Sequence, residues 1–340
     1  KTDMLGINVT PSQNREYSYT DKKAGYWYGT THQEELQWYS GWNMAKKRIL
    51  ADYTLSKDDK ALRKSDAICT VFPDRLVRKW DNAVETFRLL DEIPALVINL
   101  DTDADSISCV LDTTLLKNNE ATAEGLLVTP HEAADSRILL TPLSRSGFEV
   151  IPFGIKAPAS AGGFILTYGT TEECNELTAK VRSDLKSLIT QRKDRINGLI
   201  TEYNPVKSNL PELDKALDWI TITMDELITE QQGNGIYAGL PWFNEYWGRD
   251  MFISMPGACL VTGQFDVAKE ILKDFVKLQD NDPSSETYGR IPNRANLEGI
   301  LYNTTDGTPR LVIQALELAE YSGDTSFLED IYPAIKTSID

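Results

Sequence analysis

The sequence predicts an α+β protein with three parts: an antiparallel β-sandwich over residues 1–170, a linking helix over residues 171–204 and a helical α/α domain over residues 205–340. Short apolar segments separated by Asp, Asn, Gly and Pro recur in the first part, which is typical of antiparallel strands joined by turns. Beyond residue 205, apolar residues recur with the spacing of helices. A chain of 340 residues is long enough to form two such domains.

Six short segments of the first part have the composition of strands, because apolar residues dominate them and turn-forming residues bound them. They are residues 95–100, 106–111, 125–129, 137–141, 147–153 and 162–168. The opening segments Gly25–Thr31 and Leu36–Leu55 are also predicted as strands, since they are rich in aromatic and β-branched residues.

One long amphipathic helix is predicted over residues 172–200. Thr171 precedes two glutamates at its expected start, and apolar residues then follow at helical spacing. These apolar residues are Leu177, Val181, Leu185, Leu188 and Ile196. The segment Glu202–Pro211 that follows is the expected hinge.

Every regular element beyond residue 205 is predicted to be a helix, with about five helices in all. Four of them are expected at Leu213–Ile228, at Phe265–Val276, from Thr308 as N-cap and from Asp324 as N-cap. Pro309 supports the third start, because proline is favoured at the first helical position. A sheet of three or more strands is therefore not expected within residues 210–340.

Charge and composition argue against several classes of protein. The formal net charge is −16, with Lys and Arg scattered, so neither a nucleic acid nor an anionic membrane is an expected partner. No apolar run approaches the roughly 18 residues that span a bilayer. Cys69, Cys109, Cys174 and Cys259 lie far apart and are expected as buried free thiols rather than zinc ligands. No nucleotide is expected, since no phosphate-binding glycine motif is present. No feature of the sequence supports a metal or a redox cofactor either.

Two segments are candidates for a site. Gly239–Gly257 places Arg249 and Asp250, expected as a buried ion pair, at a predicted helix start, where the first-turn N–H groups favour a carboxylate. Gly289–Val312 carries Asp306 directly before another predicted helix. We expect both loops to meet in one pocket at the ends of helices. The alternative is that Asp250 only caps its helix and Arg249 is solvated.

The residue types of the first segment fit a neutral sugar. Four large aromatic residues precede the Arg-Asp pair: Trp242, Phe243, Tyr246 and Trp247. Aromatic rings offer flat apolar faces that match the C–H face of a pyranose. Arg and Asp beside them can form charge-assisted hydrogen bonds with vicinal hydroxyls. The aromatic cluster is therefore interpreted as a sugar platform.

Three segments carry a resemblance to a known family: "AGLPWFNEYWGRDMFISMPGACLVTGQFDVAKEILKDF", "GRIPNR" and "YNTTDGTPRLVIQALELAEYSGDTSFLEDIYPAIK". Over residues 238–336 they resemble, in order and spacing, the amylo-α-1,6-glucosidase region of glycogen debranching enzymes. The resemblance implies a six-hairpin α/α toroid of twelve helices, of which residues 205–340 form a first, incomplete part. It also implies a glycoside hydrolase that acts with inversion on α-1,6-linked glucosyl units of an α-glucan or oligosaccharide. The N-terminal part loosely resembles the β-sandwich domain of prokaryotic members.

Site residues follow from the same resemblance, because similar toroids use the Arg and Asp of a W-x-R-D motif to hold the hydroxyls of the terminal glucose. The substrate-binding candidates are Trp242, Trp247, Arg249, Asp250, Asn303 and Asp306. Where the family often has an apolar or aromatic wall, this chain has Pro309-Arg310, which bears on branch specificity.

The catalytic acid and base are expected downstream of Asp340. Inverting hydrolysis needs two carboxyl groups roughly 6.5–9.5 Å apart, one protonated and one ionised. No Asp or Glu of this sequence can be assigned to that pair. About five helices are predicted after residue 205, whereas the toroid of the family has twelve, so we also expect the natural chain to continue.

Two other functions stay open at this point. One is a different α-glycosidase on the same fold, and the other is a non-catalytic carbohydrate-binding protein in which the sandwich binds the sugar. The resemblance implies a cytoplasmic protein, with an exported, periplasmic one as the alternative.

Overall fold

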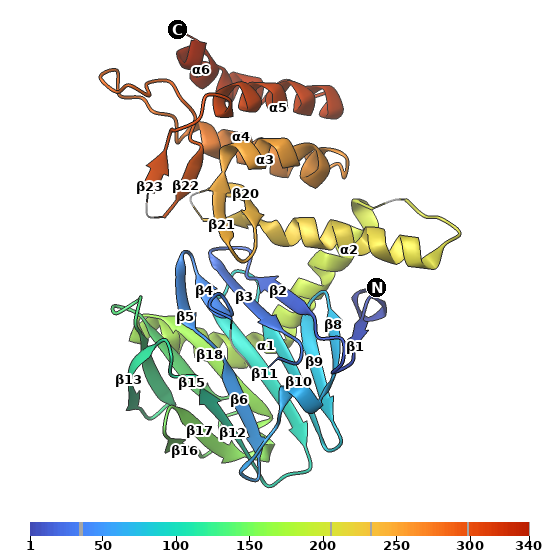
Figure 1. The fold of residues 1–340 in the computed structure, drawn as a ribbon, viewed down its shortest axis with the longest axis vertical. Coiled ribbons are helices and arrows are strands. Elements are labelled where there is room, and N and C mark those ends of the chain that lie inside the picture. Colours follow the sequence, from blue (N-terminus) through green and yellow to red (C-terminus); the bar gives the residue numbers. More distant parts are fainter. Residues whose placement is uncertain (34–36, 205, 232, 298, 340) are drawn as a thin grey trace. The chain divides into compact units, whose positions relative to one another are not determined.

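The computed structural model contains both helices and antiparallel sheets (Figure 1). The residues that it describes are 1–33, 37–204, 206–231, 233–297 and 299–339. The chain forms two compact units, which we call the N-terminal and the C-terminal unit. The first comprises Lys1–Asp21 and Gly25–Asn197, and the second comprises Lys22–Ala24 and Gly198–Asp340.

The described part of the N-terminal unit contains three sheets with antiparallel strand pairs. The nine-stranded sheet has the order β1 (Ile7–Val9), β8 (Ile68–Phe72), β9 (Arg75–Trp80), β10 (Ala83–Leu89), β11 (Ala95–Thr102), β18 (Gly163–Gly169), β15 (Arg137–Pro142), β14 (Leu126–Pro130) and β13 (Leu116–Ala121). The five-stranded sheet has the order β16 (Glu149–Ile151), β17 (Gly154–Pro158), β12 (Ser106–Leu111), β6 (Tyr53–Lys57) and β7 (Lys60–Ala61). The four-stranded sheet has the order β2 (Glu16–Thr20), β3 (Gly25–Thr30), β4 (Gly41–Met44) and β5 (Lys47–Leu50).

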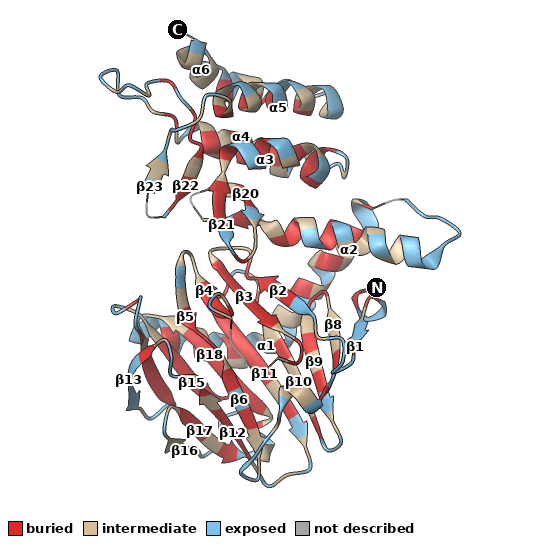
Figure 2. Cartoon of the chain, viewed as in Figure 1, coloured by how far each residue is buried: buried red, intermediate tan, exposed pale blue. Residues whose placement is uncertain are grey.

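One face of the nine-stranded sheet shares a hydrophobic core with the two smaller sheets (Figure 2). β10 shows why, because its buried residues alternate with half-buried ones, as expected for a strand with one face in a core. Phe87 of β10 contacts Trp27 of β3 at 5.0 Å and Tyr53 of β6 at 6.1 Å between ring centroids. These three rings come from the three sheets, so the core is continuous across them.

The long helix α1 (Thr171–Glu202) confirms the helix predicted over residues 172–200. Thr170 and Glu173 exchange hydrogen bonds of 3.3 and 2.7 Å between side chain and backbone, which is a capping box. The apolar side chains of the helix pack against residues of β11 and β18 in a second cluster. Its helix members are Leu177, Val181, Leu185 and Leu188.

Five of the six expected strand segments correspond to strands, namely β11, β12, β14, β15 and β18. The sixth, residues 147–153, is wrong as a single strand. Phe153 has a φ of 50°, so the chain turns there, and Ile151 of β16 pairs with Gly154 of β17. The expected segment Leu36–Leu55 contains β4, β5 and the start of β6, while Leu36 lies outside the described residues.

The C-terminal unit contains the predicted helices. They are α2 (Pro211–Leu227), α3 (Gly248–Met255) with a π-helical extension (Pro256–Leu260), α4 (Phe265–Val276), α5 (Gly307–Ser322) and α6 (Leu328–Ile339). Their apolar faces meet in one core, in which Phe252 of α3 contacts Phe275 of α4 edge-on at 5.5 Å. The spacing of α4 was well predicted, since Ala268, Ile271 and Leu272 are buried.

The expectation that residues 210–340 contain no sheet of three or more strands is wrong. Within the described residues a five-stranded sheet has the order β19 (Ile228–Glu230), β20 (Asn234–Gly239), β21 (Phe243–Trp247), β22 (Arg294–Asn296) and β23 (Gly299–Leu301). The aromatic residues before Arg249 favour strand β21. The same aromatic residues also fit a ligand platform, so their composition alone does not distinguish a strand from a binding loop.

Two expected helix starts are also wrong. α5 begins at Gly307, and the Thr308 hydroxyl accepts the backbone N–H of Ile291 at 3.0 Å instead of capping the helix. α6 begins at Leu328, whereas the carboxylate of Asp324 accepts the N–H of Ser326 at 2.8 Å before the helix. In both cases the side chain fixes a loop rather than the helix start.

Two chemical expectations can be compared with the structure. All four cysteines are free and buried, as predicted. In the part of the chain that the structure describes, no helix has the length and apolar character required to cross a membrane.

Candidate functional site

The two candidate segments are paired in the C-terminal sheet. Trp247, the last residue of β21, lies opposite Arg294, the first residue of β22. The chain enters α3 directly after this pair, where the Gly248 N–H donates to the carbonyl of Asn293 at 2.7 Å. A Cβ on Gly248 would lie 2.4 Å from the carbonyl oxygen of Pro292, so the close approach requires glycine. The sheet therefore holds the start of α3 against the second segment.

The loop before α5 is fixed to the same strand. The Asn293 side chain donates to the Asn303 side-chain oxygen at 2.9 Å, and the Asn293 N–H donates to the carbonyl of Leu301 at 2.8 Å. The bond from Ile291 to Thr308 ties the first turn of α5 to the residues before β22. As a result, the exposed Asn303 and the start of α5 lie near the end of β21.

An ion pair joins the two segments at their helix starts. Arg249 Nε lies 3.2 Å from Asp306 Oδ2, and Arg310 Nε donates to the same oxygen at 3.1 Å. The side chain of Arg249 is 54% exposed and that of Asp306 is 37% exposed. The expected buried pair of Arg249 with Asp250 is therefore wrong. In the described part of the chain the partner of Arg249 is Asp306, and the pair lies at the surface.

The two arginines determine the charge state of Asp306. The hydrogen bond from Arg310, together with the charges of Arg249 and Arg310, lowers the pKa of Asp306. Its carboxylate is therefore ionised at neutral pH and can only accept hydrogen bonds. It can hold Arg249 in place or bind hydroxyl groups, but it cannot donate a proton.

Arg294 is a site residue that sequence reasoning missed. Its guanidinium lies 5.8 Å from the centre of the Trp247 ring, within the range of a cation–π contact. Trp247 Nε1 is buried and has no hydrogen-bond partner among the described residues, whereas the buried Arg294 Nε lies 3.8 Å from Glu245 Oε2, an ion pair that is too long for a hydrogen bond. The motif "GRIPNR" contains this arginine, but nothing in the motif shows which residue of β21 faces it.

The aromatic cluster divides into separate groups. Tyr246 is a core residue, because it is buried and its hydroxyl donates to the carbonyl of Thr229 at 2.6 Å. Trp242 and Phe243 are about half exposed, but they lie at the opposite end of β21 from Trp247. Five residues of strand span about 16 Å. The structure therefore does not bring Trp242 to the Arg249–Asp306 pair.

Asp250 and Glu245, the other carboxylates near the ion pair, have different surroundings. Asp250 is exposed in the first turn of α3, where the N-cap position belongs to Trp247, so the alternative that Asp250 is the cap is also wrong. Its charge still lies at the favourable end of the helix dipole. Glu245 is buried and accepts a hydrogen bond from the amide of Asn296. We therefore treat Asp250 as available to a ligand and Glu245 as structural.

The comparisons with known proteins bear on the same part of the chain. No curated protein matches this sequence. Residues 198–340 match the family model described as amylo-alpha-1,6-glucosidase, and both segments of the site lie in this range. Residues 198–340 are therefore similar to the amylo-alpha-1,6-glucosidase family.

Proposed function

We propose that residues 198–340 form the sugar-binding part of a glycoside hydrolase of the glycogen-debranching type. The substrate would be an α-glucan or oligosaccharide, hydrolysed at α-1,6-linked glucosyl units with inversion. The observation that carries the proposal is the contact between Arg249 and Asp306, which joins the two segments of the sequence that resembled this family. The match of residues 198–340 supports a carbohydrate substrate.

Each residue of the site has a role that fits one terminal glucosyl unit. Arg249 presents a planar set of donors to neighbouring hydroxyls, and Asp306 keeps that plane in position. Asp250 accepts hydrogen bonds from hydroxyl groups, and Trp247 offers an aromatic face to the sugar ring. The exposed Asn303 adds an amide at the rim of the site.

Catalysis needs groups that this site does not supply. The described carboxylates nearby are Asp306, which is paired with Arg249, Glu245, which is buried against Asn296 and Arg294, and the exposed Asp250. Asp306 and Glu245 are engaged by these partners, and Asp250 alone cannot supply both an acid and a base. We therefore place the proton donor and the base outside these residues. Trp242 would contact a more distant glucosyl unit, and Arg310 would make the edge of the site polar.

The finer architecture belongs to the same proposal. The sheets of the N-terminal unit would form a β-sandwich domain, supported by their shared core. Helix α1 would be the link, and the helices of the C-terminal unit would be the first hairpins of an α/α toroid. The five-stranded sheet of the C-terminal unit would be formed by extended loops at the end of the toroid that carries the site.

The test is a binding titration of the chain with isomaltose, an α-1,6-linked disaccharide, and with cellobiose, a β-linked one. We expect saturable binding of isomaltose that is weakened at least tenfold in Asp250→Asn, and weaker binding of cellobiose. Asp266→Asn is the matched control, since Asp266 is an exposed carboxylate in the first turn of α4. Equal affinity for both sugars, or an unchanged Asp250→Asn variant, would contradict the proposal.

A further inference from the structure

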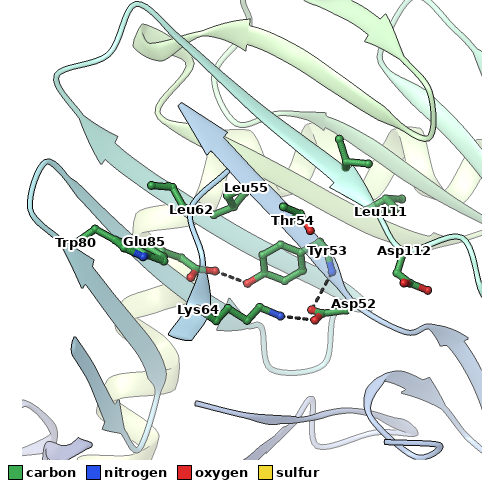
Figure 3. Close-up of a pocket in the computed structure, with 11 residues that line it drawn as sticks. Asp52, Tyr53, Thr54, Leu55, Leu62, Lys64, Trp80, Glu85, Leu111 and Asp112 are labelled. Atoms are coloured by element: carbon green, nitrogen blue, oxygen red, sulfur yellow. Dashed lines mark hydrogen bonds and ion pairs between the residues drawn. The ribbon is translucent and has the colours of Figure 1, made fainter. Parts of the chain in front are cut away.

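The N-terminal unit contains a polar pocket of about 150 Å³ that the proposed function does not use (Figure 3). It lies where β9 and β10 of the nine-stranded sheet approach β6 and β12, which belong to the five-stranded sheet of the N-terminal unit. The residues that matter are Asp52, Tyr53, Lys64, Trp80, Glu85 and Asp112. We propose that this pocket binds one neutral sugar unit and is a second carbohydrate site.

A fixed hydrogen-bond network forms the floor of the pocket. The Tyr53 hydroxyl donates to Glu85, and Arg78 donates to the other oxygen of Glu85 at 3.0 Å. Arg78 also donates to the carbonyls of Thr30 and Thr31, each at 3.1 Å. These contacts neutralise the buried charge of Glu85 and leave its position defined before any ligand binds. Burial raises the pKa of Tyr53, so its hydroxyl stays a donor at all working pH values.

One wall of the pocket carries a donor and an acceptor side by side. Lys64 forms an ion pair with Asp52, whose other oxygen accepts the backbone N–H of Tyr53 at 2.8 Å. Lys64 Nζ lies 5.5 Å from the centre of the Tyr53 ring. Vicinal hydroxyls of a sugar each donate and accept, so adjacent ammonium and carboxylate groups suit them.

The other wall is apolar. The Trp80 indole N–H donates to the carbonyl of Arg63 at 2.7 Å, which fixes the ring at the pocket edge. Leu55 and Leu62 add aliphatic surface. A pyranose has the matching division into a C–H face and a hydroxyl edge.

Charge and size exclude the main alternatives to a neutral sugar unit. The lining carries one cation, Lys64, and two carboxylates, Asp52 and Asp112, besides Glu85, which Arg78 neutralises, so a phosphate would meet net negative charge. Among the described residues, no group of three His, Cys, Asp or Glu could hold a metal ion. A purely apolar ligand would strip water from the charged wall. One water needs roughly 10–15 Å³, so a pocket of about 150 Å³ holds about 10 to 15 water-sized groups, comparable with the roughly dozen non-hydrogen atoms of one hexose.

The test uses tryptophan resonances to separate this pocket from the site in residues 198–340. The chain has seven tryptophans, and 5-fluorotryptophan gives each of them a ¹⁹F signal. The signals of Trp80 and Trp247 are assigned by substitution with Phe. Glucose and maltose are then titrated into the chain, with glycerol as the control; the choice of α-glucan sugars rests on the proposed function.

We expect the Trp80 signal to shift saturably with glucose and maltose. Lys64→Met should weaken this shift at least tenfold, while Lys64→Arg, which keeps the charge, should stay within a few-fold of the unmodified chain. Lys60→Met is the matched control, since Lys60 is exposed on β7 outside the pocket lining. Unchanged signals of the other tryptophans show that the variant is folded.

The outcomes distinguish this site from the proposed one. A Trp80 shift that persists in Arg249→Ala supports an independent site, even if Trp247 never responds to a sugar. The proposal is overturned if the Trp80 signal does not move at saturating sugar, or if glycerol moves it equally. It is also overturned if a folded Lys64→Met variant binds with unchanged affinity.

Discussion

Asp306 organises the candidate site at the scale of single residues. One of its carboxylate oxygens forms an ion pair with Arg249, at the start of α3, and accepts a hydrogen bond from Arg310, in the first turns of α5. Because the contact is solvent-exposed, its contribution to stability is small. Its effect is on geometry, since it fixes the plane of the Arg249 guanidinium that we propose binds the sugar.

Arg249→Lys should weaken isomaltose binding by roughly 10- to 100-fold. An ammonium group cannot reproduce two parallel hydrogen bonds, and the loss of one charge-assisted bond corresponds to about 1.5–3 kcal/mol. Calorimetric titration measures the change. Arg290→Lys is the matched control, because Arg290 is exposed in the same unit and its side chain donates a long hydrogen bond of 3.4 Å to the Tyr302 carbonyl. Equal affinities of the two variants would contradict the role of Arg249.

The titration of Asp306 should reflect its two arginine partners. Its pKa is lowered by the hydrogen bond from Arg310 and by the charges of Arg249 and Arg310. A carboxyl with a lowered folded-state pKa stabilises the fold above its unfolded pKa, and this contribution is lost as the pH falls through the folded value. A ¹³C NMR titration of the carboxyl carbon should give a midpoint below about 3.9, the ordinary Asp value.

The variant Arg310→Gln tests the cause of that shift. This variant removes the hydrogen bond from Arg310, the largest cause of the lowered pKa, and leaves Arg249 in place. The titration midpoint of Asp306 should therefore move to higher pH. A midpoint above the ordinary Asp value in the unmodified chain would show that burial outweighs the arginines, and would contradict our description of the carboxylate.

At the scale of elements, the five-stranded sheet of the C-terminal unit positions the site. The pairing of β21 with β22 brings together segments that lie about 50 residues apart in the sequence. Gly248 connects this sheet to α3. Its N–H donates to the carbonyl of Asn293, and the space that a Cβ would need is occupied by the carbonyl oxygen of Pro292.

Gly248→Ala should lower the free energy of unfolding by about 1–3 kcal/mol, the usual effect of overpacking. The added methyl group would lie 2.4 Å from a backbone oxygen that cannot rotate away. Gly257→Ala is the control, since its Cβ would meet nothing within 4 Å and its effect should be neutral or stabilising by about 0.4–1 kcal/mol. Urea denaturation compares the two variants, and equal stabilities would contradict the close approach.

The elements differ in how well the sequence predicts them. α1 and α4 were predicted because a repeating apolar spacing over many turns is a local signal. β21 and β22 were not, because strands of five and three residues are too short to show alternation, and their partner lies far along the chain. The same limit applies to the site. Asp306 and Arg249 were predicted as neighbours from their places before helices, but their pairing with each other was not.

At the scale of the whole molecule, the chain consists of two units with separate cores. Three buried thiols report on the N-terminal unit, and Cys259 reports on the C-terminal unit. Burial raises the pKa of Cys69 to about 11 and that of Cys259 to about 12, so neither is reactive in the folded state. The thiols can therefore follow the unfolding of each unit.

We expect thiol labelling during heating to show two transitions if the units are separate domains. Cys69, Cys109 and Cys174 should react together, and Cys259 should react at a different temperature. Mass spectrometry of alkylated peptides gives the four curves. Four coincident curves would contradict the proposed division into domains, and rapid labelling of any thiol at room temperature would contradict its burial.

The proposed chemistry makes a further prediction for the whole chain. The site offers binding groups without a proton donor, so the purified 340-residue chain should bind isomaltose but release no glucose from it. A glucose assay with long incubation, calibrated with an added α-1,6-glucosidase, measures this. Release that disappears in Asp250→Asn would show that Asp250 acts in catalysis and not only in binding.

The central claim is that the starts of α3 and α5 form one subsite for a terminal glucosyl unit. A crystal structure of the chain soaked with isomaltose tests it most directly. We predict that the non-reducing glucosyl unit lies within hydrogen-bond distance of both Arg249 and Asp250, with Asp306 still paired to Arg249. A sugar bound elsewhere, with these three residues empty at saturating isomaltose, would contradict the account.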